Sequence, residues 1–215
     1  MNNKNKYIDH TILLANAKRE DIDKIISEAI EYDFATICIN PSWVEYAAKK
    51  LKGENPGITT VIGFPLGAMS TKAKVFEAKD AISNGADEID MVMNIGKFKD
   101  KEYDYVLNEI NSIKSAIGDK VLKVIVETAL LDNNEIAKIS KIVSSSKADF
   151  IKTSTGFSTR GASVEDVKIM SENINKKTTL IKAAGGVRTP KDLEAMIKNG
   201  ASRIGTSKGV SLLEG

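Results

Sequence analysis

Cysteine and histidine are almost absent from this sequence. Its 215 residues include one cysteine, Cys38, and one histidine, His10. A single cysteine cannot form an intramolecular disulfide or a cysteine zinc cluster, and a single histidine cannot build a histidine-rich metal site. The sequence therefore disfavours metal-dependent chemistry, and we expect no metal.

Long apolar runs and an excess of one charge are missing as well. Lys and Arg number 31 and Asp and Glu number 29, and the two signs are interleaved, so we expect no nucleic-acid or membrane surface. No stretch approaches the ~20 apolar residues of a membrane span, and residues 1–6 lack the apolar segment of a signal peptide. We expect a cytoplasmic protein that binds a small molecule.

The sequence does contain a regular alternation of two hydrophobic periods. Eight short runs rich in β-branched residues predict strands over residues 7–10, 35–39, 59–64, 88–93, 122–127, 150–153, 179–183 and 203–206. Between them the apolar residues recur every three or four positions, as Ile22, Ile25, Ile26 and Ala29 do. Helix starts are predicted at Asn40-Pro41, Asp132 and Thr189-Pro190, and helix ends at Gly85 and Gly200. Each repeat spans about 27 residues, the length of one βα unit.

Strictly alternating strands and helices imply a parallel sheet, and eight units in this length close most simply into a (β/α)₈ TIM barrel. The 42% apolar content suffices for one core, so we predict a single domain over residues 1–215. The alternative is a doubly wound open sheet, but no GxGxxG sequence follows the first predicted strand.

Alternation along the predicted strands separates two faces. In the strand 88–93, Ile89, Met91 and Met93 suit the helix face, which sends Glu88, Asp90 and Val92 into the barrel. The same parity sends further polar side chains inward: Asp9, Cys38, Asn40, Lys123, Glu127, Lys152 and Lys182. His10 then faces the helices and is interpreted as structural. Cys38 suits a small core residue better than a nucleophile.

Lys152 and Lys182 are the unusual members of this set. They occupy two consecutive strands, which lie roughly 4.8 Å apart in a sheet, so each ammonium should lower the pKa of the other, and burial acts in the same direction. A neutral lysine amine can form a Schiff base with a carbonyl, and Asp90 could carry protons through water. This pattern predicts carbon–carbon lyase chemistry without a metal.

A purely structural role is the alternative for each charged residue. Lys152 could form a salt bridge with Asp90 or Glu127, and Asp90 could simply neutralise Lys123. We interpret Lys123 and Glu127 as a structural pair deeper in the barrel. Two lysines at adjacent strand ends favour the catalytic interpretation of Lys152.

Glycines follow the last two predicted strands, at Gly185-Gly186 and at Gly205-Thr206-Ser207. Barrels commonly bind phosphate at these positions with backbone N–H groups and the start of a short helix, here expected at 208–213. A glycine pair alone is usually a turn, but glycines at both positions predict a substrate with a phosphate monoester.

The chain resembles the deoxyribose-phosphate aldolase family. Six motifs carry the resemblance, in family order over nearly the whole chain: 9–11 (DHT), 38–41 (CINP), 88–92 (EIDMV), 152–157 (KTSTGF), 182–189 (KAAGGVRT) and 203–207 (RIGTS). Arg160 and Lys208 depart from the family pattern, and each either strengthens the field at the phosphate or is solvated surface charge.

The resemblance implies a (β/α)₈ fold and reversible cleavage of 2-deoxy-D-ribose 5-phosphate, in deoxyribonucleoside catabolism, to D-glyceraldehyde 3-phosphate and acetaldehyde. It implies Lys152 as the Schiff-base lysine, Asp90 as the proton carrier and Lys182 as the lysine that tunes Lys152. It places the phosphate on Gly156, Gly185, Gly186, Gly205, Thr206 and Ser207, and Asp9 and Cys38 along the substrate cavity. It implies no cofactor, and a homodimer as the usual assembly.

Two other functions fit the same residues. One is a phosphosugar isomerase or synthase in which the lysines act only as charges or acids. The other is a phosphosugar-binding barrel without catalysis.

Overall fold

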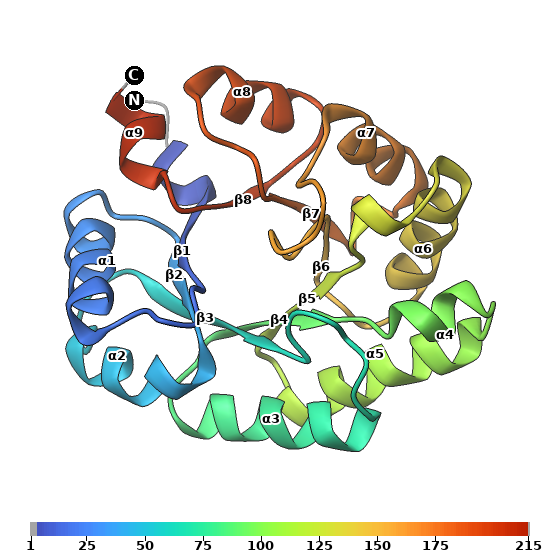
Figure 1. The fold of residues 1–215 in the computed structure, drawn as a ribbon, viewed down its shortest axis with the longest axis horizontal. Helices are drawn as coiled ribbons and strands as arrows, with labels where there is room; N and C mark the ends of the chain where they lie inside the picture. The colour runs from blue at the N-terminus through green and yellow to red at the C-terminus, as the bar shows by residue number, and fades with distance from the viewer. Residues whose placement is uncertain (1–3, 215) are drawn as a thin grey trace.

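Eight parallel strands close into a barrel in the computed structural model, which describes residues 4–214 (Figure 1). The strands pair in chain order, and β8 pairs with β1 to complete the ring. They are β1 (Ile8–Ile12), β2 (Thr36–Ile39), β3 (Gly57–Ile62), β4 (Glu88–Val92), β5 (Val121–Ile125), β6 (Phe150–Lys152), β7 (Leu180–Ala184) and β8 (Arg203–Thr206). The predicted (β/α)₈ barrel is confirmed; residues 1–3 and 215 of the predicted domain lie outside the described residues.

Helices surround the barrel, one layer deep (Figure 1). The α-helices are α1 (Arg19–Glu31), α2 (Val44–Lys50), α3 (Thr71–Ser83), α4 (Ile95–Lys99), α5 (Tyr103–Ile117), α6 (Asn133–Ser145), α7 (Val164–Asn173), α8 (Pro190–Lys198) and α9 (Gly209–Glu214). Short 3₁₀ helices are η1 (Lys4–Tyr7), η2 (Pro41–Trp43) and η3 (Thr128–Leu130). None of the described helices is long and apolar enough to cross a membrane.

The helix boundaries follow local chemistry. Asp132 caps α6 and Thr189 caps α8, and each forms a capping box with the acidic residue three positions on. Gly85 and Gly200 follow the ends of α3 and α8 with φ of +108° and +114°, a conformation that glycine adopts without strain. Pro41 begins η2 instead of α2, because its ring fits the first position of a tight turn and α2 starts only at Val44.

The two faces of the strands carry different chemistry, as the alternation predicts. Ile89, Met91 and Met93 pack with the helices in the main hydrophobic core. Glu88 and Asp90, on the same strand, face the barrel interior and bind interior lysines. His10 faces α1, where its Nε2 lies 2.6 Å from Glu28 Oε2, as predicted.

Strand register sets the height of each interior side chain. Lys152 lies opposite Lys182 across β6 and β7, and Asp90 lies opposite Lys123 across β4 and β5. Residues paired in this way share one level of a parallel barrel. The register therefore brings interior cations and carboxylates from six strands into one layered cluster.

Candidate active site

Asp90 joins the two lysines that the sequence singled out. Its Oδ2 lies 2.7 Å from Lys152 Nζ and 2.7 Å from Lys182 Nζ. All three side chains are buried, at 3% exposure or less. Three side chains from β4, β6 and β7 thus meet at one carboxylate oxygen, which is the geometry that a proton carrier between two amines requires.

The second oxygen of Asp90 serves a different lysine. Asp90 Oδ1 accepts a hydrogen bond of 2.9 Å from Lys123 Nζ, and Lys123 also pairs with Glu88. Asp90 therefore neutralises Lys123 and contacts Lys152 as well, and its catalytic role stays a prediction.

The predicted pair of Lys123 with Glu127 is wrong. Lys123 is level with Asp90, whereas β5 ends at Ile125 and Glu127 lies beyond it, in a left-handed backbone conformation with φ of +56°. Glu127 accepts hydrogen bonds from the N–H and the hydroxyl of Thr155 instead. The chain turns at the strand end, which removes the Glu127 carboxylate from the interior ion pairs.

Asp9 and Arg203 extend the cluster toward the other end of the barrel. Asp9 pairs with Lys182 and lies 2.6 Å from Arg203 Nη1, and Arg203 also contacts Glu88 at 3.0 Å. Arg203 was not among the predicted site residues. The alternation of side chains along β8 points it into the barrel together with Gly205, and this alternation was the available signal. Arg203 is a structural cation that connects β8 to β1 and β4.

The two lysines differ in proton affinity, contrary to the predicted mutual lowering. Burial and the neighbouring Lys182 lower the pKa of Lys152, and Asp90 only partly offsets them. Burial would also lower the pKa of Lys182, but the carboxylates of Asp9 and Asp90 outweigh it and raise that pKa above its ordinary value. The Asp9 contact, which Lys152 lacks, is the physical reason for the difference.

The interior cluster contains one more cationic side chain than carboxylates, so one of its cations can be neutral. The carboxylates are Asp9, Glu88 and Asp90, and the cations are Lys123, Lys152, Lys182 and Arg203. Loss of one proton balances the charges, and buried unbalanced charge is costly. Among the cations of the cluster, Lys152 has a lowered pKa and lines a cavity, so it is the amine suited to nucleophilic attack.

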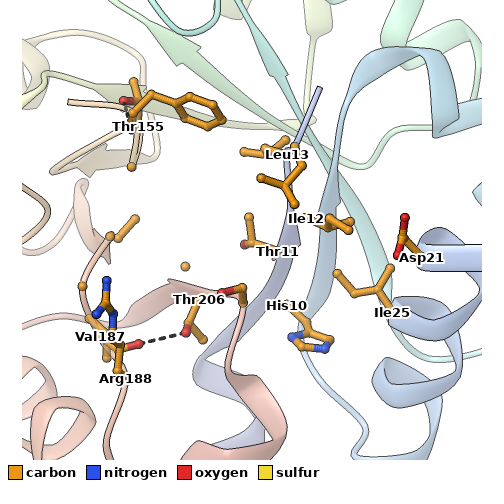
Figure 2. A pocket seen from close by; sticks show the side chains of 18 of the residues that line it. His10, Thr11, Ile12, Leu13, Asp21, Ile25, Thr155, Val187, Arg188 and Thr206 are labelled. Carbon is orange, nitrogen blue, oxygen red and sulfur yellow. Dashed lines mark hydrogen bonds between the residues drawn. The ribbon is translucent and has the colours of Figure 1, made fainter. Parts of the chain in front are cut away.

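A cavity of about 540 Å³ opens above Lys152, at the carboxyl ends of the strands. All six predicted phosphate residues line it: Gly156, Gly185, Gly186, Gly205, Thr206 and Ser207. Figure 2 shows side chains of β1, α1, β8 and the loop after β7 around this space. Asp90, Lys182, Asp9 and Cys38 are fully buried and are not among the lining residues.

Cys38 lies in a small apolar cluster with Leu13 and Val61. Burial raises the pKa of its thiol, against the opposing effect of Lys182. A protonated buried thiol is a poor nucleophile.

The loops after β7 and β8 are tied together beside the cavity. The Thr206 hydroxyl donates a 2.9 Å hydrogen bond to the Val187 carbonyl and accepts one from the Lys208 N–H (Figure 2). Because this hydroxyl already donates its proton to Val187, it has none to donate to an anion. Gly185 and Gly186, with φ of +78° and +81°, let the backbone after β7 take its shape.

Gly161 and several of the lining residues were not predicted as site residues. A Cβ at Gly161 would stand 2.2 Å from the Gly185 carbonyl oxygen, so the loops after β6 and β7 can touch only through glycine. Thr155, Phe157, Val187 and Arg188 also line the cavity. Each lies within one of the motifs that carry the family resemblance, and this position in a motif was the available signal.

Arg160 does not line the cavity, and its side chain, 43% exposed, is a surface charge held in a salt bridge. Its guanidinium binds Asp166 with both nitrogens, at 2.5 and 3.1 Å, and donates to the Thr128 carbonyl. Asp166 is a buried carboxylate in the capping box of α7, and it attracts Arg160 away from the cavity. Arg160 therefore fastens the loop after β6 to η3. Lys208 is exposed, and its role stays a prediction.

Known proteins with similar sequences are aldolases. Residues 5–214 match the model of the DeoC/LacD family aldolases. A deoxyribose-phosphate aldolase of Mycoplasmopsis pulmonis (strain UAB CTIP) is 58% identical over 210 residues, which cover 98% of this chain and 95% of the relative.

Solved structures show the same similarity. The structure of a candidate deoxyribose-phosphate aldolase from Coccidioides immitis is 44% identical, with a TM-score of 0.93 over 96% of this chain and 82% of that one. A deoxyribose phosphate aldolase from Aeropyrum pernix, described as a tetramer, is 30% identical with a TM-score of 0.89, over 98% of this chain and 89% of that one.

Proposed function

The chain belongs to the DeoC/LacD family of aldolases, and from this membership we propose that it reversibly cleaves 2-deoxy-D-ribose 5-phosphate to D-glyceraldehyde 3-phosphate and acetaldehyde. Lys152 forms the Schiff base, and the reaction serves deoxyribonucleoside catabolism. The observation that carries the proposal is the position of Lys152. It lines the cavity, its pKa is lowered, and it contacts Asp90, which also contacts Lys182.

The neutral amine of Lys152 attacks the aldehyde carbon of the open-chain substrate. Loss of water from the carbinolamine gives a protonated imine, and the imine draws the electrons of the C2–C3 bond as the C3 hydroxyl loses its proton. D-glyceraldehyde 3-phosphate leaves, and the remaining enamine takes up a proton at carbon. Addition of water then releases acetaldehyde and restores the amine.

Asp90 and Lys182 support these proton transfers. Burial would raise the pKa of Asp90, but Lys123, Lys152 and Lys182 hold it well below its ordinary value. Asp90 therefore stays ionised, and its Oδ2 holds Nζ of Lys152 and Nζ of Lys182 in place. Lys182, which stays protonated, supplies a positive charge that favours the neutral form of Lys152.

The phosphate lies against the loops after β7 and β8 in this proposal. Gly185, Gly186, Gly205 and Ser207 line that side of the cavity, and their backbone N–H groups suit an oxyanion. Asp9 and Cys38, fully buried under the cavity, act through the residues above them and not by direct contact with the sugar.

Trapping of the imine tests the proposal. Treatment with acetaldehyde and borohydride should leave an irreversible ethyl group on Lys152, which peptide mass spectrometry locates. Lys152→Met should abolish both the adduct and turnover in an assay coupled to release of glyceraldehyde 3-phosphate. The variant should remain folded, because Lys123 and Lys182 still neutralise Asp90.

Two outcomes separate the proposal from the other functions. Active wild-type protein without an adduct on Lys152 would indicate an isomerase or synthase in which lysines act as charges. Binding of 2-deoxy-D-ribose 5-phosphate without any product would indicate a phosphosugar-binding barrel.

We also propose that the enzyme works in the cytoplasm as a homodimer. Support for self-association comes from large exposed apolar side chains, of which Leu66 and Phe76 are each 74% exposed, since such side chains are common in subunit interfaces. Light scattering coupled to size exclusion chromatography gives the mass of the assembly directly.

A further inference from the structure

Glu127 is a buried carboxylate in an unusual setting. It is 3% exposed, and among residues 4–214 it forms no salt bridge, since Lys123 and Arg160 pair with other carboxylates. Its Oε1 is buried without a hydrogen-bond partner. Its backbone is left-handed, with φ of +56° and ψ of +69°. Burying an unpaired carboxylate on strained backbone costs stability, and proteins keep such residues chiefly at functional sites.

The contacts of Glu127 lead to the cavity wall. Its Oε2 accepts hydrogen bonds from both the N–H and the hydroxyl of Thr155. The Thr155 hydroxyl accepts in turn from the Phe157 N–H at 3.0 Å, which closes a tight turn around Gly156 with φ of +88°. Thr155, Gly156 and Phe157 all line the cavity.

Figure 2 shows Thr155 on the wall of the cavity opposite the α1 side. The turn also fixes the Phe157 ring, whose centroid lies 5.2 Å from that of Phe64 in an edge-to-face contact. Phe64 follows β3, so this aromatic pair joins the loops after β3 and β6. The orientation of Thr155 therefore affects the shape of the cavity mouth as well as its wall.

We propose that Glu127 is a positioning residue for substrate binding, which orients the Thr155-Gly156-Phe157 turn as one wall of the substrate cavity. The inference rests on the proposed aldolase function and adds to it a residue that acts through Thr155. Glu127 makes no contact with Lys152, Asp90 or Lys182, so its removal should weaken binding of the sugar phosphate and leave the chemistry at Lys152 intact.

The carboxylate of Glu127 suits its surroundings better than an amide would. One carboxylate oxygen accepts two donors of Thr155, and no nearby donor competes for the other oxygen. Glutamine at this position keeps one acceptor oxygen for Thr155 and replaces the oxygen that has no partner with an amide NH₂. We therefore expect a graded series, in which Glu127→Gln retains more binding than Glu127→Ala.

Steady-state kinetics separate positioning from a purely structural role. In Glu127→Ala we expect KM for 2-deoxy-D-ribose 5-phosphate to rise about tenfold with kcat within about twofold of wild type, the pattern of lost binding. In Glu127→Gln the rise should be about threefold, as expected for partial retention of the acceptor. Glu172→Gln, an exposed change on α7, is the matched control. Trapping with acetaldehyde and borohydride should proceed at the wild-type rate in all of these variants.

Thr155→Val provides an independent variant should Glu127→Ala fail to fold. It removes the hydroxyl that donates to Glu127 and keeps the side-chain shape. We expect the same rise in KM, and little further rise in the double variant Thr155→Val/Glu127→Gln, because residues that act through one contact are not additive.

Calorimetric titration of the sugar phosphate into proteins that also carry Lys152→Met gives a dissociation constant that depends neither on turnover nor on adduct formation. A wild-type protein that forms no adduct contradicts the proposed aldolase function, whereas weaker binding in the Glu127 variants still supports the positioning role. An unchanged KM and dissociation constant in both Glu127 variants would overturn that role. So would a fall in kcat of about a hundredfold at constant KM, which marks lost transition-state stabilisation.

Discussion

Asp9 is the carboxylate that distinguishes Lys182 from Lys152. Lys152 and Lys182 share Asp90 Oδ2 at equal distances of 2.7 Å, but Lys182 also pairs with Asp9. The additional negative charge keeps Lys182 protonated, and the positive charge of Lys182 then helps to keep Lys152 neutral. The roles that we propose for the two lysines, nucleophile and cation, therefore follow from the neighbours of each lysine and not from residue type.

The pH dependence of activity follows from this assignment. The pKa of Lys152 is lowered, so the neutral amine, and with it the rate, appears at lower pH than for an ordinary lysine of pKa about 10.4. Lys182→Met removes a neighbouring cation and leaves Asp90 to Lys152 and Lys123. Both changes raise the pKa of Lys152, so the acid limb of the pH–rate profile should move to higher pH.

A rise of one in the pKa of Lys152 lowers the neutral fraction of its amine at pH 7 about tenfold. The measurement is kcat as a function of pH for Lys182→Met and wild type. Lys141→Met, an exposed change on α6, is the control and should keep the wild-type profile. A Lys182→Met profile that coincides with wild type would remove Lys182 from the tuning of Lys152.

At the scale of elements, a second ion pair holds the end of the strand that carries Asp90. Lys74 on α3 and Glu109 on α5 are 2.9 Å apart, and both side chains are fully buried. Lys74 donates to the Val92 carbonyl, and Glu109 accepts from the Asn94 N–H. Two helices thus fix the carboxyl end of β4 through polar contacts inside the helix layer.

Removal of one partner from this pair should destabilise the protein strongly. Lys74→Met leaves the Glu109 charge buried without its cation, and we expect a loss of about 3–5 kcal/mol in the free energy of unfolding. The double variant Lys74→Met/Glu109→Met should recover much of that loss, since well-packed apolar side chains replace a buried ion pair at little cost.

Urea unfolding at neutral pH measures both changes. Lys72→Met, two residues away on α3 and exposed, should change stability by less than about 0.5 kcal/mol. Equal losses in Lys74→Met and Lys72→Met would show that the buried pair contributes little.

At the scale of the whole molecule, the interior charges help to close the barrel. Arg203 on β8 contacts Asp9 on β1 and Glu88 on β4, and Asp9 also accepts from Thr36 on β2. These contacts connect residues almost two hundred positions apart, in addition to the β1–β8 hydrogen bonds. The first and last strands are therefore joined by charge as well as by backbone pairing.

The stability of the protein at low pH should depend on the charges that join the first and last strands. Burial would raise the pKa of Asp9, but Lys182, Lys123 and Arg203 outweigh it, so the folded pKa lies below the ordinary value. A depressed folded pKa contributes stability that is fully present above the unfolded pKa of about 3.9 and is lost as the pH falls below it. Wild-type stability should therefore drop steeply below about pH 4.

Arg203→Met should reduce the stability that the lowered pKa of Asp9 contributes, because the pKa of Asp9 in the folded protein moves up toward its unfolded value. We expect about 3–5 kcal/mol less stability at neutral pH, and a shallower fall between about pH 4.5 and 3. Urea unfolding across this range checks both, with the exposed Arg19→Met as the control. A parallel pH dependence in Arg203→Met and wild type would refute the coupling.

The sequence by itself determined the barrel and the direction of its side chains. Period-2 runs, helix-period segments and capping residues such as Asp132 and Thr189 are local signals, and they located eight strands to within two residues of their observed bounds. Alternation sent Asp90, Lys152 and Lys182 inward for the same local reason: successive side chains of a strand point to opposite faces.

Only the tertiary structure decided how those interior residues pair and which of them carries a charge. Glu127 was expected beside Lys123 and instead orients Thr155, because β5 ends before it and the chain turns. Lys182 was expected to share its lowered pKa with Lys152, but Asp9, far away in the sequence, raises it. Coulomb energy depends on distance between side chains from different strands, and that distance is fixed only when the barrel closes.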